Sequence, residues 1–256
     1  MDVTSDIIFL CIIAFTAGFV DAIIGGGGLI QTPLALVILP QYSVATVIGT
    51  LKIPAIGGTS MASLTYAKNV KLNFKMLLFM MGIACVAAYA GSALLASVSN
   101  SFMKPFLLVV LVLVAIYTYF NKSFGLHKEK KHSKREQWIY CGIISVVLGF
   151  YDGFIGPGAG SFLVLCFIGF LGFDFLRASA HAKFVNFSTN LGSIIFFALS
   201  GKIIYSIALP MAVFNAAGGY TGARLAILRG NKFIRIFFLV IVSITILRFA
   251  YDVFFK

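Results

Sequence analysis

The chain has 256 residues, of which 60% are hydrophobic and only 11% are charged, and its formal net charge is +12. This apolar fraction is more than a soluble domain can hide in its core, so a soluble protein is excluded. Apolar runs of roughly 20 residues recur along the chain, which is the length that crosses a bilayer core. The composition therefore predicts a polytopic membrane protein.

The positive charge and the cysteines both favour a structural interpretation. Lys and Arg lie mostly in short loops, where they mark the cytoplasmic side of a membrane protein, and we expect no nucleic-acid partner. No pair among the four cysteines has the spacing of a metal or redox motif, so we expect buried thiols and neither a metal nor a cofactor. These cysteines are Cys11, Cys85, Cys141 and Cys166.

The first predicted span runs from Ile7 to Ile24 and ends in the glycine run Gly25–Gly28. Such a run permits unusual backbone angles and the close approach of a ligand. A short apolar piece follows, from Leu29 to Leu39, and it is too short to cross a membrane unaided. We expect it to be either a half-helix or a re-entrant segment.

The segment from Val44 to Tyr66 is the next element, and Lys52, Pro54 and the pair Gly57-Gly58 interrupt it. These interruptions predict a broken helix. A basic loop follows, and two further spans, Met76 to Ala96 and Phe102 to Phe120, complete the first half.

Residues 122–137 form the only hydrophilic stretch, and their basic residues predict a cytoplasmic linker. We therefore divide the chain into a first transmembrane repeat (1–121), the linker (122–137) and a second transmembrane repeat (138–256). The second repeat follows the plan of the first, with a break at Gly156-Pro157-Gly158-Ala159-Gly160, a short piece to Leu171 and a polar, interrupted segment from Arg177 to Leu199.

The two halves match at a constant offset of 131 residues. The stretch from Gly18 to Gly27 falls on the stretch from Gly149 to Gly158, and the register continues beyond it without a gap. It aligns Asp21 with Asp152, Lys52 with Lys183, Tyr89 with Tyr220, Gly91 with Gly222 and Asn100 with Asn231. This pattern indicates an internal duplication, which is typical of two-halved membrane transporters.

Loop charge predicts how the halves are oriented. The linker and the loops Lys68–Lys75 and Arg229–Arg235 are basic and are expected inside, which places the repeat partner of the first of these loops, Ser200–Tyr205, outside. Equivalent loops on opposite sides indicate an inverted repeat. The fold class is thus an all-α integral membrane protein with glycine-broken segments and about eight to ten transmembrane helices. The inverted arrangement is favoured over eight spans in parallel halves.

Charged residues inside membrane segments cost ~2.5–3.5 kcal/mol each on insertion scales and are the first functional candidates. Here they come in symmetric pairs, Lys52 with Lys183 and Asp21 with Asp152. The lysines are candidates for attracting an anion. The aspartates, together with His181, are candidates either for proton coupling or for structural charge. A structural alternative pairs Asp21 with Lys52 and Asp152 with Lys183.

Broken helices also favour an anion site, because the free N–H groups at the start of a half-helix and the positive helix end attract negative ligands. Two breaks related by a repeat axis would meet at one site near the membrane midplane. The predicted substrate-binding residues are therefore Gly25, Gly26, Gly27, Gly28, Lys52, Gly156, Gly158, Gly160, Lys183, Asn186, Thr189 and Asn190, and no catalytic or metal-binding residue is predicted.

Both glycine stretches with their preceding aspartates resemble the signature stretches of the TauE/SafE family of sulfite-exporter-like transporters. The segment Ala182-Lys183-Phe184-Val185-Asn186-Phe187 is similar to the second-half motif of that family. The resemblance covers nearly the whole chain and implies a bacterial inner-membrane permease for sulfite, sulfonates or related sulfur anions. One position departs from the family pattern: Leu51 stands where an Asn usually precedes the lysine.

We expect a secondary transporter that exports a small anion by alternating access, with the anion and the lipid bilayer as its partners and a homodimer as one option for its assembly. A passive anion channel is the main alternative. An intramembrane enzyme is disfavoured because the sequence has no Ser-His, HExxH or paired-Asp motif. A scaffold would not need symmetric buried charge.

Overall fold

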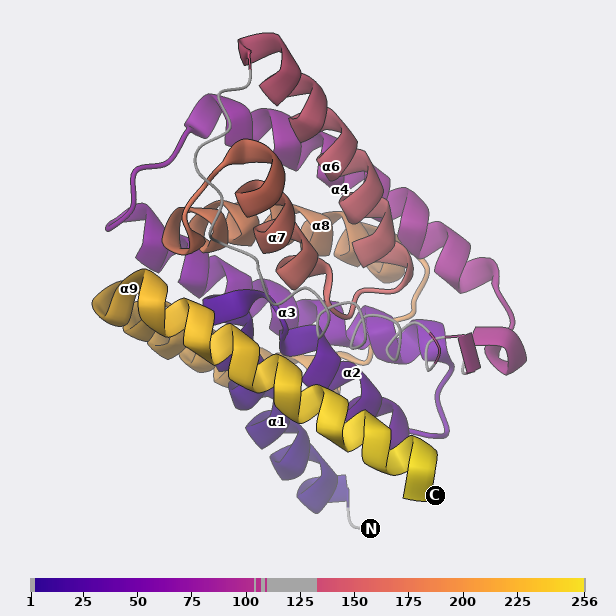
Figure 1. Ribbon diagram of the computed structural model, residues 1–256. Coiled ribbons are helices and arrows are strands. Elements are labelled where there is room, and N and C mark those ends of the chain that lie inside the picture. The colour runs from indigo at the N-terminus through magenta and orange to yellow at the C-terminus, as the bar shows by residue number, and fades with distance from the viewer. Residues whose placement is uncertain (1–2, 104, 107–108, 110–132, 256) are drawn as a thin grey trace.

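The computed structural model describes residues 3–255 except 104, 107–108 and 110–132, and every helix or strand that it describes is an α-helix (Figure 1). The all-α prediction is confirmed for this part of the chain. Most of the predicted span from Phe102 to Phe120 and most of the predicted linker at 122–137 lie outside the described residues.

The first half contains α1 (Val3–Ile24), α2 (Gly27–Ile38), α3 (Val44–Ala67) and α4 (Phe74–Ser97). The second half contains α6 (Lys134–Phe154), α7 (Ala159–Leu171), α8 (Phe175–Leu199) and α9 (Tyr205–Phe255). Gly230, with a φ of 68°, divides α9 into two helices. Four helices among the described residues, α1, α3, α4 and α8, are long and apolar enough to cross a membrane, which makes the chain a multi-pass membrane protein.

The helix starts recur at the offset that the sequence indicated. Lys134 at the start of α6 lies 131 residues after Val3, Phe175 lies 131 after Val44, and Tyr205 lies 131 after Phe74. Polar side chains cap several of these starts: Ser43 accepts from Thr46 N–H before α3, and Asp174 accepts from Arg177 N–H before α8. Such caps satisfy N–H groups that have no partner inside the helix.

Helices of the two halves pack against each other in a crossed manner. In Figure 1 the first-half helix α4 lies beside the second-half helix α6, and α1 in turn packs against α9. Glycines make these contacts close: a Cβ on Gly91 would lie 2.2 Å from the carbonyl oxygen of Phe150, and one on Gly222 would lie 2.4 Å from that of Phe19. Small residues are what allow membrane helices to approach in this way.

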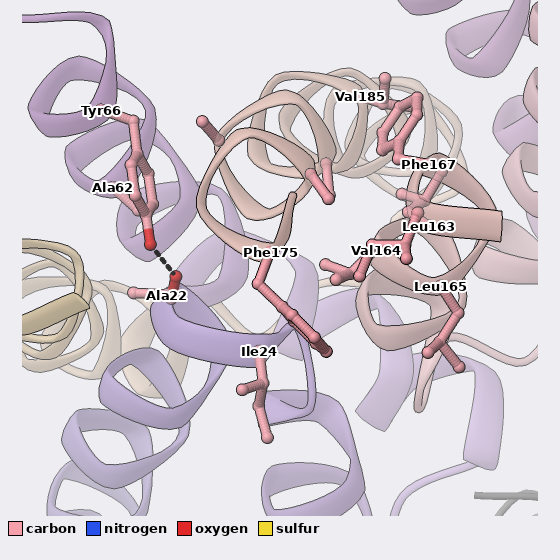
Figure 2. Close-up of a cluster of buried hydrophobic side chains, with 14 of the residues drawn as sticks. Ala22, Ile24, Ala62, Tyr66, Leu163, Val164, Leu165, Phe167, Phe175 and Val185 are labelled. Atoms are coloured by element: carbon pink, nitrogen blue, oxygen red, sulfur yellow. Dashed lines mark hydrogen bonds between the residues drawn. The ribbon is translucent and has the colours of Figure 1, made fainter. Parts of the chain in front are cut away.

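A buried apolar cluster joins the end of α1 to α3, α7 and α8, as Figure 2 shows. Tyr66 of α3 is fully buried there, and its hydroxyl donates to the carbonyl oxygen of Ala22 at 2.9 Å. This bond satisfies a polar group near the end of α1. Phe175, the first residue of α8, lies in the same cluster near Ile24. The cluster therefore fixes the end of α1, just before the first glycine break.

The prediction of a broken third segment is wrong in both halves, because α3 and α8 are each continuous helices. Pro54 lies inside α3 without ending it. The glycine pair serves helix packing instead: a Cβ on Gly57 would lie 3.0 Å from the carbonyl oxygen of Ala212, and one on Gly58 would lie 2.0 Å from Oδ1 of Asn215. These glycines let α9 approach α3 closely, which is a common use of small residues in membrane helices.

Two loops that connect equivalent helices contact α3 and α8 near their starts. Ile204 N–H, in the loop between α8 and α9, donates to Thr50 Oγ1 of α3 at 3.0 Å. Asn73 N–H, in the loop between α3 and α4, donates to His181 Nε2 of α8 at 3.3 Å. The loop 200–204 thus lies beside the N-terminal part of α3, whereas the loop 68–73 follows its C-terminal end.

Candidate functional site

The two glycine breaks meet inside the protein. Gly25 separates α1 from α2 with a φ of 82°, and Gly156 separates α6 from α7 with a φ of 89°. Their backbones touch so closely that a Cβ on Gly25 would lie 2.2 Å from the carbonyl carbon of Gly160. Only glycine combines this left-handed conformation with so close an approach. The breaks therefore position the starts of α2 and α7 side by side.

A cavity of about 70 Å³ lies at this meeting point. Because one water needs about 10–15 Å³ by the same measure, the cavity holds a few waters or a small ion. Its lining includes Asp21, Gly25, Gly27, Gly28, Gln31, Thr32, Lys52, Thr59, Asp152, Gly156, Gly158, Gly160, Asn186, Asn190 and Asn215.

Two buried ion pairs cross between the halves. Lys52 Nζ lies 3.0 Å from Asp152 Oδ1 and also donates to the Asp152 carbonyl oxygen at 2.7 Å. Lys183 Nζ lies 2.7 Å from Asp21 Oδ2. The alternative that paired Asp21 with Lys52 and Asp152 with Lys183 is wrong, because each aspartate reaches the lysine of the other half. The pairs consequently tie the two halves together at the cavity.

Hydrogen bonds hold both aspartates in place. Thr189 Oγ1 donates to Asp152 Oδ2, and the same hydroxyl contacts the Asn186 carbonyl oxygen at 2.9 Å. Gly27 N–H, at the start of α2, donates to Asp21 Oδ1 at 3.4 Å. Buried charges need such partners, because removal from water is costly unless the charge is paired and hydrogen-bonded. One backbone donor of the first break is therefore already occupied by Asp21.

The helix starts at the cavity offer donors of another kind. Neither Gly26, before α2, nor Gly158, before α7, gives its helix a side-chain cap. The first N–H groups of a helix have no intrahelical acceptor, and they carry the positive end of the helix dipole. Lys52 adds a cationic donor, but Asp152 neutralises it. The cavity is thus rich in donors while its charged side chains are balanced.

Most of the predicted binding residues line the cavity, namely Gly25, Gly27, Gly28, Lys52, Gly156, Gly158, Gly160, Asn186 and Asn190, and both candidate aspartates do so too. Gly26, Lys183 and Thr189 are not among its lining residues. Lys183 is fully buried behind Asp21, and Thr189 contacts the cavity only through Asp152. A direct contact between the anion and Lys183 would require the Asp21 pair to open.

His181 lies away from the cavity, near the start of α8. Its Nε2 accepts from Asn73 N–H at 3.3 Å, so Nδ1 carries the proton and donates to the Arg177 carbonyl oxygen at 2.7 Å. Both ring nitrogens therefore have partners, which matches a structural role more closely than a proton relay at the cavity.

Gln31, Thr32 and Asn215 line the cavity and were not predicted from the sequence. Each is buried, and Asn215 Nδ2 donates to Gln31 Oε1 at 3.2 Å. The only signal in the sequence was a polar residue within an apolar helix. Among the described residues no three His, Cys, Asp or Glu side chains gather as a metal site.

Comparisons with known proteins agree on one family. The family model described as "Sulfite exporter TauE/SafE" matches residues 10–249. A probable membrane transporter protein, ORF9, of Sinorhizobium is 35% identical over 93% of this chain and 89% of its own length. A probable membrane transporter protein of Haemophilus influenzae is 32% identical over 98% of both chains. The probable membrane transporter protein YfcA of Escherichia coli is 29% identical over 95% of this chain and 89% of its own length.

No solved structure matches the chain. The relatives are named as probable membrane transporters and not as enzymes, and the family match extends over both halves and both glycine breaks. Together with the helices long and apolar enough to cross a membrane, this match shows that the chain belongs to the TauE/SafE family of membrane transporters.

Proposed function

We propose that the protein is a secondary transporter that exports a small sulfur-containing anion, such as sulfite or a sulfonate, across the bacterial inner membrane by alternating access. The observation that carries this proposal is the donor-rich cavity between two uncapped helix starts, joined by ion pairs that cross between the halves. The name of the matching family is the source of sulfite as the first substrate to test.

An inverted repeat is part of this proposal, and the loop contacts support it. The loops 68–73 and 200–204 occupy equivalent places in the two halves, yet they lie at opposite ends of the continuous helix α3. The loop contact between Asn73 and His181 and the bond from Leu176 N–H to Asn231 Oδ1 at 2.8 Å bring two basic loops to the start of α8. Basic loops on one side agree with a cytoplasmic face there.

The crossed ion pairs supply a physical reason for movement between the halves. An anion that enters the cavity competes with Asp152 for Lys52, since both are negative ligands of the same ammonium group. Displacement of Asp152 would break one link between the halves and leave a buried carboxylate, whose charged form is then disfavoured. Substrate binding and the contact between halves are therefore coupled in this proposal. A homodimer remains part of it only as an option for assembly.

Flux measurements on purified protein in proteoliposomes test the proposal. We expect labelled sulfite to cross faster than in empty liposomes, with saturation and with acceleration by unlabelled sulfite on the opposite side. A passive channel would conduct without that acceleration. Repeating the assay with and without a pH gradient tests proton coupling. Absence of flux for sulfite and for a sulfonate such as ethanesulfonate would contradict the proposed substrate class.

A further inference from the structure

Gln31 presents a hydrogen-bond donor that the protein itself does not use. Its side chain lies on α2, lines the cavity and is only 4% exposed. Its Oε1 accepts from Asn215, whereas its Nε2 has no hydrogen-bond partner. A buried amide nitrogen without a partner is costly, and such groups in native proteins need an explanation.

We propose that Gln31 Nε2 is a donor to the transported oxyanion and that, with Lys52, it fixes the position of the anion in the cavity. This inference rests on the proposed transport function. The bound anion would supply the acceptor that the amide lacks, and the amide adds a neutral donor to a site where Lys52 and Asp152 are already balanced. An oxyanion has several acceptor oxygens and so can engage the amide, the ammonium and a helix start together.

Asn215 acts as the positioning residue for this donor. Its Nδ2 donates to Gln31 Oε1 at 3.2 Å across the contact between α9 and α2. That bond occupies the carbonyl end of the Gln31 amide and leaves the NH₂ end for the cavity. Asn215 itself is 3% exposed and is held in a tight space, because a Cβ on Gly58 would lie 2.0 Å from its Oδ1.

This donor pair breaks the symmetry of the two halves. The residues 131 positions away from Gln31 and Asn215 are Phe162 and Ala84, which are apolar. Likewise Lys52 lines the cavity, whereas its counterpart Lys183 does not. The first half therefore supplies both of these side-chain donors, and the anion is expected to sit off the repeat axis, toward α2 and α3.

Two variants remove the donor in different ways. Gln31→Leu removes all polar atoms, and Gln31→Glu keeps the shape and an acceptor for Asn215 while it removes the amide nitrogen. For both we expect the KM for sulfite flux in proteoliposomes to rise at least about tenfold, as for the loss of a hydrogen bond to a charged ligand. Asn215→Ala is expected to raise the KM less and to leave the maximal rate nearly unchanged.

Ser193→Ala is the matched control, because Ser193 is also buried and its hydroxyl also has no partner, but it does not line the cavity. Its KM should stay within about twofold of wild type. If wild type carries sulfite and either inserted Gln31 variant keeps the wild-type KM, Gln31 does not bind the anion, and the inference fails while the transport function stands. If wild type carries neither sulfite nor ethanesulfonate, the proposed function fails, and the inference fails with it.

Discussion

Asp21→Asn is expected to lower the free energy of unfolding by about 3 kcal/mol, because it leaves the Lys183 ammonium without a counterion. Lys183 is fully buried, and Asp21 Oδ2 lies 2.7 Å from its Nζ. Removing one member of a buried pair costs more than removing both, since the remaining charge has lost both water and its partner. Thermal unfolding of the purified protein in detergent measures the effect.

Double variants test which lysine belongs to which aspartate. Asp21→Asn combined with Lys183→Met removes both members of one crossed pair and should restore most of the lost stability. Asp21→Asn combined with Lys52→Met removes residues from two different pairs and should be less stable than either single variant. If the second combination were the one that restored stability, the crossed arrangement would be wrong.

Gly25→Ala is the second change with a large expected effect. The new Cβ would lie 2.2 Å from the backbone of Gly160, at a φ of 82° that residues with a side chain rarely adopt. Backbone strain and overpacking together should cost about 3 kcal/mol or more, and transport should be lost because the two helix starts are forced apart. The melting temperature and the sulfite flux of the same preparation check both effects.

Gly26→Ala is the control for this change. Gly26 is the next residue, but its φ is −100° and the nearest atom to a new Cβ lies 3.6 Å away. An alanine there keeps the backbone N–H and should cost less than about 1 kcal/mol. Equal loss of stability in the two variants would mean that the glycine break tolerates no side chain at any position, and the contact with Gly160 would not be the cause.

Several parts of the fold could be predicted from the sequence because each depends on local pattern. Apolar length predicted the membrane class, and the short pieces after both glycine runs correspond to α2 and α7. The offset of 131 residues recurs in the helix starts. Pattern alone failed for α3, where Gly57 and Gly58 looked like a break. Their role is set by the approach of α9, a contact between distant segments that spacing does not reveal.

The site was predictable in its residue types and less so in its connections. The sequence singled out both lysines and both aspartates, but a repeat relates equivalent residues without saying which half each one contacts. The crossed pairing follows from the packing of the two halves. Gln31 and Asn215 were missed because symmetry guided the choice of candidates, and their counterparts Phe162 and Ala84 are apolar. Their pairing depends on the contact between α2 and α9, which only the fold reveals.

The most direct measurement compares sulfite flux in wild type and in the double variant Lys52→Met/Asp152→Asn. The double variant removes the cavity ion pair without leaving a buried charge unpaired, so the protein should still fold. If Lys52 binds the anion, wild-type proteoliposomes will carry labelled sulfite and those with the folded, inserted double variant will carry at least about tenfold less. Flux equal to wild type in the double variant would show that this pair only stabilises the fold, and the anion site would have to lie elsewhere.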